Sequence, residues 1–300
     1  MTAYSDYPSS QTGRIVVKGQ APIVVNRKVI TATNVIPGRL AVRASSDGGI
    51  KVGDGVSAPV GWVGYEQSDE IARPADMTTA FGSSTQAPVL SGGSFAIQGW
   101  TLAGTYVQQG ELMASFIDGC VMPAEMVEGR LYLKYPYSKH TGETSTYMVF
   151  PAGVVISDVK LRITTAVSGS TLDVGLLSSE GGGDANGFLA QESGYNGGTT
   201  GIVIHNLGDT TQGLETPGAL LNEVELVSSD GGAIYYNAPT LHVCDGTAKT
   251  LTYSTSSHAV VGYILVCASS PGIKVVGKAA MTVDASLAST ATACIVESEL

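Results

Sequence analysis

Apolar and polar side chains alternate along much of this chain. The pattern is clearest around Val159–Val167. Every second residue from Val159 is apolar or Thr, and the opposite face carries Asp158, Lys160, Arg162 and Thr164. Successive side chains on a strand point to opposite faces of a sheet, so this period of two predicts a half-buried β-strand. Ser168-Gly169-Ser170 interrupts the run and Thr171–Leu177 resumes it, which predicts a hairpin.

Short runs of the same kind fill the first half of the chain, separated by Gly, Pro and Asp turn signals. We expect strands at Arg14–Lys18, Ile23–Val25, Lys28–Ala32, Arg39–Arg43, Ile50–Val52, Val60–Tyr65, Ser94–Trp100, Thr105–Val107, Glu111–Phe116, Cys120–Met122 and Arg130–Tyr135. A weak internal echo links Gly38-Arg39-Leu40, followed by Asp47-Gly48, to Gly110-Glu111-Leu112, followed by Asp118-Gly119. If the echo reflects structure, the first half is a small barrel built of similar hairpins.

Longer strands are expected in the second half, at Tyr147–Phe150, Val154–Val167, Thr171–Leu177, Gly201–His205, Leu221–Val227, Ala233–Tyr236, Thr240–Val243, Thr250–Tyr253 and Val260–Ala268. That number of strands in one domain is typical of a jelly roll or a related sandwich. We therefore predict an all-β protein, with a small N-terminal β-barrel domain followed by a jelly-roll-like β-sandwich. The expected organisation is an N-terminal arm at 1–13, the barrel at 14–135, a linker at 136–142, the sandwich at 143–270 and a C-terminal arm at 271–300.

Composition supports this class of fold, because only 14% of residues are charged and 38 are Gly. The net charge of -10 argues against binding the phosphate backbone of nucleic acids. The N-terminus lacks the basic start and apolar core of a signal peptide, and no stretch is long enough for a membrane helix, so we expect synthesis in the cytoplasm. Four cysteines, Cys120, Cys244, Cys267 and Cys294, form no CxxC pair; they are either buried free thiols or include a Cys244–Cys267 disulfide.

Few residues in the sequence suggest catalysis or metal binding. The four histidines, His140, His205, His242 and His258, show no metal-binding spacing. The oxygen-bearing residues Glu180, Asp184, Asn186 and Glu192 surround a glycine-rich loop, which could hold calcium but also carries ordinary turn chemistry. Glu223 and Glu225 fit the solvent face of a strand, and no nucleophile motif or P-loop occurs. We expect no enzyme activity, no metal and no cofactor.

Aromatic residues offer candidate contact positions. Trp62 and Trp100 lie in apolar strand settings, so each is either a sugar platform or, more simply, a core residue. Tyr235-Tyr236 places one ring inward and one outward, and the outward ring could contact a neighbouring subunit or a sugar.

Two groups of segments resemble structural proteins of tailed phages. NVIPGRLAVRASSDGGIKVGDGVSAPVGWVGYE, Asn34–Glu66, and YVQQGELMASFIDGCVMPA, Tyr106–Ala124, resemble the small β-barrel head decoration or cement proteins. Phe150–Ala166, Leu172–Leu177 and Asp184–Leu189 resemble a jelly-roll module of phage structural proteins. The resemblance is one of pattern and covers about two-thirds of the chain; the segment after Pro271 has no counterpart.

The resemblance implies a virion protein on the outer capsid surface, bound to the major capsid protein and self-associated as a homotrimer. Arms could add strands to adjacent subunits. The expected capsid or subunit contacts are Arg39, Arg43, Trp62, Tyr65 and Tyr236. The alternatives are a carbohydrate-binding module, which would bind glycan, and a fibre- or spike-type component for host adhesion.

Overall fold

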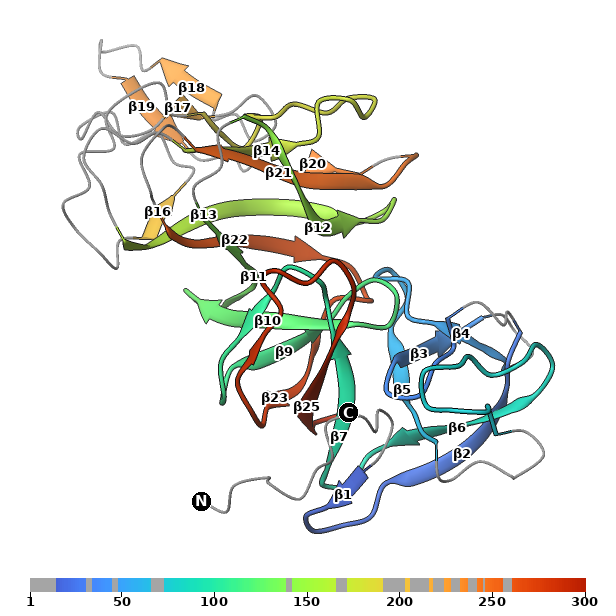
Figure 1. The fold of residues 1–300 in the computed structure, drawn as a ribbon. Coiled ribbons are helices and arrows are strands. Elements are labelled where there is room, and N and C mark those ends of the chain that lie inside the picture. The colour runs from blue at the N-terminus through green and yellow to red at the C-terminus, as the bar shows by residue number, and fades with distance from the viewer. Residues whose placement is uncertain are drawn as a thin grey trace. The chain divides into compact units, whose positions relative to one another are not determined.

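A computed structural model confirms the all-β class (Figure 1). The structure describes residues 15–30, 34–44, 48–65, 73–138, 142–165, 172–190, 203–205, 216–217, 224–227, 233–236, 242–244, 246–255 and 261–300. The chain divides into two compact units. We call Met1–Leu131 together with Ser270–Leu300 the barrel unit, and Tyr132–Ser269 the sandwich unit. Residues 271–300, expected as a separate arm, thus belong to the same unit as the N-terminal barrel.

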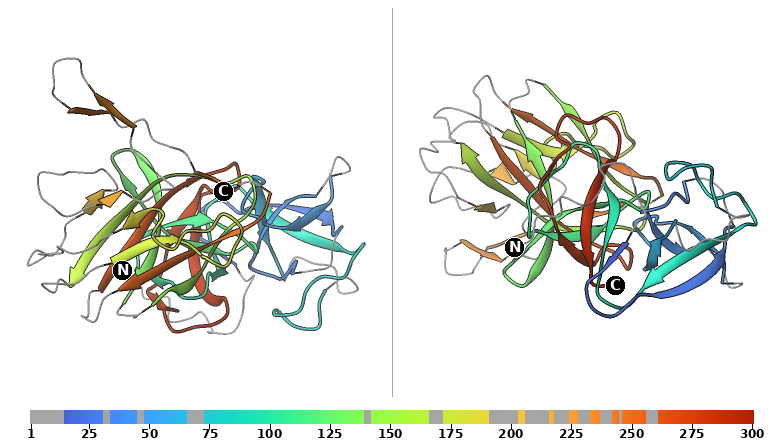
Figure 2. Two further views of the ribbon diagram at one scale, coloured as in Figure 1. Left: turned by 90° about the horizontal axis from the view of Figure 1, so that it is seen from above. Right: turned by 60° about the horizontal axis from the view of Figure 1, so that its bottom comes forward.

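The first barrel of the barrel unit is built from β2 (Ile23–Lys28), β6 (Gln86–Ser91), β5 (Pro59–Val63), β3 (Leu40–Arg43) and β4 (Ile50–Val52), in that order. A parallel bridge between Val29 and Ile50 joins the two ends of this order and closes the barrel. Its core holds Val29, Val35, Ala41, Ile50, Val63, Phe81, Ala87 and Val89. Figure 2 shows β2 in blue beside β6 in two further views.

A second barrel in the same unit combines residues from distant parts of the chain. Its strands are β7 (Phe95–Thr101), β25 (Thr292–Ser298), β23 (Val275–Ala279), β9 (Leu112–Ser115) and β10 (Val121–Val127), in that order. Val121 on β10 pairs with Thr101 on β7, which closes the circle. The short strand β1 (Ile15–Val17) adds to β7, and β8 (Tyr106–Val107) pairs with β24 (Val283–Asp284).

The C-terminal segment therefore supplies two of the five strands of the second barrel. β25 pairs with β7 from Thr292↔Thr101 to Glu297↔Ala96, although nearly two hundred positions separate them. Cys294 and Val296 pack in one hydrophobic cluster and Ile295, between them, packs in another, as expected for a strand that is buried on both faces. Gly277 on β23 permits the close approach of β25, because a Cβ there would lie 2.0 Å from the Glu297 carbonyl oxygen.

The internal echo in the sequence corresponds to real hairpins. β3 with β4, and β9 with β10, are antiparallel pairs, and Gly48 and Gly119 of the two Asp-Gly signals lie between the paired strands. Gly38, Gly48, Gly110 and Gly119 all have positive φ, between 62° and 89°. A residue with a side chain is strained in that backbone region, so one physical reason explains glycine at all four positions.

The sandwich unit has two layers of strands, visible at the top of Figure 1. One layer holds β11 (Arg130–Tyr137), β22 (Val261–Ser269) and β13 (Val155–Thr165), with β16 (Val203–His205) and β20 (His242–Val243) on the far edge of β13. The other has the order β12 (Thr144–Phe150), β21 (Lys249–Thr255), β14 (Leu172–Leu176), β15 (Leu189–Ala190), β17 (Thr216–Pro217). β18 (Val224–Val227) and β19 (Ala233–Tyr236) form a separate hairpin. Residues 136 and 137, expected in a linker, are part of β11 and pair with β22.

Two sequence expectations fail in this unit. The hairpin predicted from Val159–Val167 and Thr171–Leu177 is wrong, because β13 pairs with β22 and β14 pairs with β21 in the other sheet. Both strands bury apolar side chains, and each does so in its own layer. Lys160, expected on a solvent face, is only 1% exposed, because the sheet is covered there on both faces.

All four cysteines are free and buried. The Cys244–Cys267 disulfide does not form. Cys244 directly follows β20, Cys267 lies on β22, and these two strands pair with opposite edges of β13. Two strand spacings of about 4.8 Å separate such positions, which exceeds the reach of a disulfide.

Candidate contact surfaces

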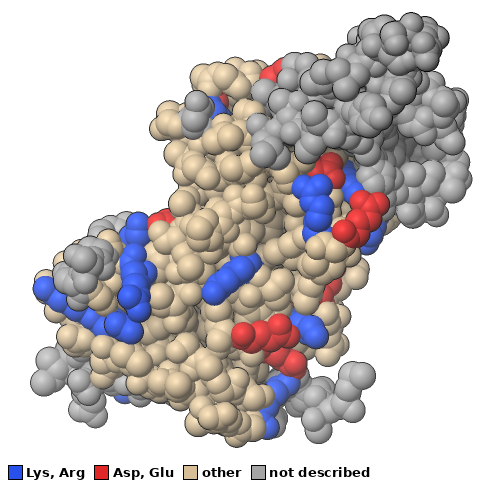
Figure 3. All heavy atoms as spheres, turned by 180° about the vertical axis from the view of Figure 1, so that it is seen from behind, with Lys and Arg blue, Asp and Glu red and all other residues tan. Residues whose placement is uncertain are grey.

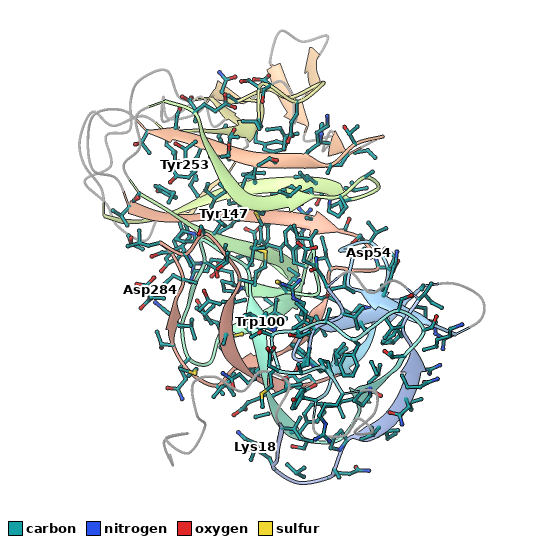
Figure 4. All side chains as sticks on the ribbon, turned by 45° about the vertical axis from the view of Figure 1, so that its right-hand side comes forward. Lys18, Asp54, Trp100, Tyr147, Tyr253 and Asp284 are labelled. Carbon is teal, nitrogen blue, oxygen red and sulfur yellow. The ribbon has the colours of Figure 1, made fainter. Side chains whose placement is uncertain are left out.

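Trp62, one of the expected contact residues, is a core residue. Its side chain is fully buried, and its indole Nε1 donates a hydrogen bond to Ser298 Oγ at 3.1 Å. A Cβ on Gly99 would lie 2.9 Å from the indole ring, so the glycine makes room for it. Trp100, labelled in Figure 4, is half-buried and donates from Nε1 to the Pro37 carbonyl oxygen at 2.9 Å. Trp62 is therefore removed from the set of surface contacts.

The other expected contact residues are scattered. Arg39 is half-buried and donates from Nη1 to the Asp118 carbonyl oxygen at 2.9 Å, so it mainly holds the β9–β10 turn. Tyr65 is half-buried, donates from its hydroxyl to the Pro74 carbonyl oxygen at 3.3 Å, and lies under the Arg73 guanidinium. Arg43 is exposed at the end of β3.

Tyr236 lies on β19, opposite Val224, and its side chain is outside the described part of the structure. The structure thus leaves Arg43 as the expected contact residue that is both described and exposed.

The glycine-rich loop uses its oxygen atoms internally. The Glu180 carboxylate accepts hydrogen bonds from the Thr250 backbone N–H at 2.8 Å and from Thr250 Oγ1 at 2.6 Å. Asp184 Oδ1 accepts from the Asn186 backbone N–H at 3.3 Å, which is turn chemistry. Glu192 lies outside the described residues. Within the described ranges, no group of three or more His, Cys, Asp or Glu could hold a metal ion.

A buried polar cluster in the sandwich unit was not predicted from the sequence. The Tyr132 hydroxyl donates to Asp158 Oδ2 at 2.5 Å, and the Lys160 ammonium lies 3.7 Å from the same oxygen and 5.2 Å from the Tyr132 ring centre. Tyr132 and Lys160 are almost completely buried, so a dissolved substrate does not reach them. A buried cation beside a carboxylate and an aromatic ring is compensated electrostatically, and the cluster links β11 to β13.

The clearest candidate contact surface lies along β2. Ile23, Val24 and Val25 are 62%, 43% and 38% exposed. Successive side chains point to opposite faces, so apolar side chains emerge on both faces of this strand. β2 pairs along one edge with β6; along its other edge, the described residues supply only the bridge at the following residue, Val29. We call Ile23–Val25 together with this free edge the β2 edge surface.

Cations gather at the end of the β2 edge surface. Lys28 is exposed, Arg27 is half-buried, and the Arg27 guanidinium lies against the β3–β4 turn, 3.7 Å from the position of a Cβ on Gly48. Arg43 pairs with Ile50, which itself bridges Val29 beside β2. In the described residues no ion pair neutralises these three cations. Figure 3 shows blue side chains gathered over this barrel and little red beside them.

Among the described residues there is no helix that could span a membrane. No protein-family model matches the chain, and no curated protein matches it. Among solved structures, the VP2 subviral particle of infectious bursal disease virus aligns at 12% identity over 97% of this chain and 78% of that chain, with a TM-score of 0.20. The structure of the Gt strain of the same virus aligns at 10% identity over the same shares, with a TM-score of 0.18. At TM-scores this low, the two alignments do not indicate a function for this chain.

Proposed function

We propose that this chain is a structural protein of a virus particle, a decoration or cement protein that binds the outer surface of a phage head and stabilises contacts between capsomers. The sequence resemblance supports the proposal, and its segments fall on structural elements. Asn34–Glu66 includes β3, β4 and β5 of the first barrel, and Tyr106–Ala124 includes β8, β9 and the start of β10.

The observation that carries the proposal is the β2 edge surface. A cement protein works by covering the surfaces of its neighbours rather than by enclosing a small molecule. A strand with a free edge and three exposed β-branched residues in a row is suited to that work, because a second protein can cover both its backbone and its side chains.

In this proposal the barrel unit binds the major capsid protein, and the sandwich unit points away from the capsid or joins copies of the chain into a homotrimer. Arg43 and Tyr65 are kept as proposed contacts, with Tyr236 as a proposed contact of the sandwich unit. Trp62 is not, since it is buried. Closed symmetry would allow neighbouring copies to cover exposed strand edges.

The number of copies in each particle tests the proposal. Particles from the source are purified, the chain is quantified against the major capsid protein by mass spectrometry, and the particles are imaged. We expect a copy number comparable with that of the capsid subunits, and density over the lattice. A few tens of copies would instead indicate a fibre, spike or portal-associated part. Absence from particles would refute a virion role and turn attention to glycan binding.

A further inference from the structure

We propose that the β2 edge surface binds an extended acidic segment of a neighbouring protein, which joins the first barrel as an added β-strand. This inference rests on the proposed function, in which the segment belongs to the major capsid protein. It goes further because it names the strand that the partner pairs with, the mode of binding and the charge of the partner.

The free edge of β2 supplies the backbone part of the argument. A strand at the edge of a sheet presents unpaired N–H and C=O groups that another chain can pair with, and soluble proteins usually protect such edges. Short length, proline, charged side chains and a bulge are the common protections, and on β2 the charges, Arg27 and Lys28, are confined to the last two residues. β2 is six residues long, contains no proline, and pairs with β6 in unbroken register from Ile23↔Ser91 to Lys28↔Gln86.

The side chains of β2 supply the second part. Five of its six residues are exposed, and the first three are β-branched and apolar. β1, which precedes it, exposes Val16 and Val17 by 41% and 45%. A partner strand beside β2 would place its own side chains against Ile23 and Val25 on one face and Val24 on the other. Burying apolar surface on both faces of one strand is what strand addition accomplishes and what a flat contact does not.

The charged residues around β2 indicate that the partner segment is acidic. The chain as a whole carries -10, so most of its surface repels an acidic segment. At the end of β2 the sign is reversed. Arg27 and Lys28 end this strand, Arg43 pairs with Ile50, which bridges the next residue, Val29, and no ion pair within the described ranges neutralises these cations. A partner strand with Asp or Glu where it passes Arg27 and Lys28 would satisfy these cations. A second copy of this chain, pairing β2 with β2, would leave them unsatisfied.

A peptide titration tests the inference apart from any particle. The full-length 15N-labelled protein is titrated with a blocked peptide, Thr-Val-Glu-Val-Glu-Val-Thr, and with its counterpart in which Lys replaces Glu. With the glutamate peptide we expect amide shifts and slowed hydrogen exchange centred on Ile23–Lys28, and weaker binding at higher salt. With the lysine peptide we expect binding at least tenfold weaker. Equal binding of both peptides, or no change on β2 at millimolar peptide, would overturn the inference.

Two variants separate charge from strand pairing. Arg27→Glu/Lys28→Glu should weaken the glutamate peptide at least tenfold and favour the lysine peptide. Val24→Lys should weaken both, because a lysine on an edge strand obstructs pairing. Lys278→Glu is the matched control: Lys278 is 52% exposed on β23, and its change should leave peptide binding within twofold. Circular dichroism confirms that each variant is folded.

The same variants distinguish the two proposals. If the wild-type chain binds undecorated particles and Arg27→Glu/Lys28→Glu binds them equally well, the inference fails while the proposed function stands. If the peptide binds β2 but the chain never binds particles, the function fails while the strand-addition site stands. Concentration-dependent self-association that Val24→Lys abolishes would show that a second copy occupies the edge, and would overturn the acidic-partner assignment.

Discussion

The indole Nε1 of Trp62 and the hydroxyl of Ser298 are hydrogen-bonded at 3.1 Å, although 236 positions separate them in the chain. The bond connects β5 of the first barrel to β25 of the second. Around it, Leu40, Trp62 and Leu90 of the first barrel share one hydrophobic cluster with Phe95, Val121, Cys294 and Val296 of the second. The two barrels of the barrel unit are therefore packed on a common core, and the C-terminus is part of that core.

Removal of this hydrogen bond should cost measurable stability. Ser298→Ala leaves the buried indole N–H without an acceptor, and we expect a loss of about 1–3 kcal/mol in the free energy of unfolding. Trp62→Phe removes the donor and some buried ring, with an expected loss of about 2–4 kcal/mol. Urea denaturation of both single variants and the double variant checks this. The double loss should be smaller than the sum, and strict additivity would show that the bond contributes nothing.

Truncation after Ser269 should prevent the barrel unit from folding. The truncated chain lacks β23 and β25, so β9 and β7 each lose one antiparallel partner and the second barrel cannot close. We expect loss of the cooperative unfolding transition of this unit and fast hydrogen exchange of β7 amides. Leu287→Ala in the full-length chain is the control, because Leu287 lies in the same segment and is 99% exposed. A truncated chain that keeps native exchange protection on β7 would contradict the prediction.

Asp54, labelled in Figure 4, should make the free energy of unfolding depend on pH. Burial alone would raise its pKa, but the Lys51 ammonium at 2.8 Å, the N–H groups of Ser57 and Val56 and the Ser57 hydroxyl lower the pKa to about 2, from 3.8. The folded state then binds this proton more weakly than the unfolded state. The stabilisation is complete above about pH 4 and is lost as the pH falls towards 2.

The expected size is about 1–2 kcal/mol after allowing for solvent screening of a partly exposed pair. Urea denaturation between pH 5 and pH 2 should show that Asp54→Asn is less stable at pH 5 and that its difference from wild type shrinks towards pH 2. Asp284→Asn is the comparison: Asp284, at the exposed end of β24, has its pKa lowered by hydrogen bonds from Ser286 but lacks the partial burial of Asp54, so a smaller change of the same sign is expected. A constant difference across this range would refute the assignment to Asp54.

The cysteine thiols should be unreactive while the protein is folded. Burial raises the pKa of Cys120 to about 11 and raises that of Cys294 further. The thiolate is the reactive form, so both thiols stay protonated at pH 8. An aromatic disulfide reagent should therefore label four thiols rapidly in denaturant and label Cys120 and Cys294 only as fast as the native chain unfolds. Rapid labelling of either one without denaturant would contradict their burial.

Many of the strands could be predicted from the sequence, because local patterns of residues indicate them. The strands at Ile50–Val52 and Ala233–Tyr236 lie where alternation placed them, and the glycine echo marked two real hairpins. β6 and β25 were missed: Pro88 interrupts the first, and the second follows a stretch of small residues without a turn signal. Of the proposed contact residues, Trp62 was misplaced because a tryptophan in a strand looks the same from the sequence on either face.

The sequence by itself determined that this protein is built of short strands and tight turns. The signals were alternation, glycine spacing and low charge, which reflect interactions between residues close together in the chain. Only the tertiary structure decided which strands pair. It separated β13 from β14, closed the second barrel with β23 and β25, and among the described residues left β2 paired along one edge only. Pairing depends on contacts between residues far apart in the chain, and no local pattern records them.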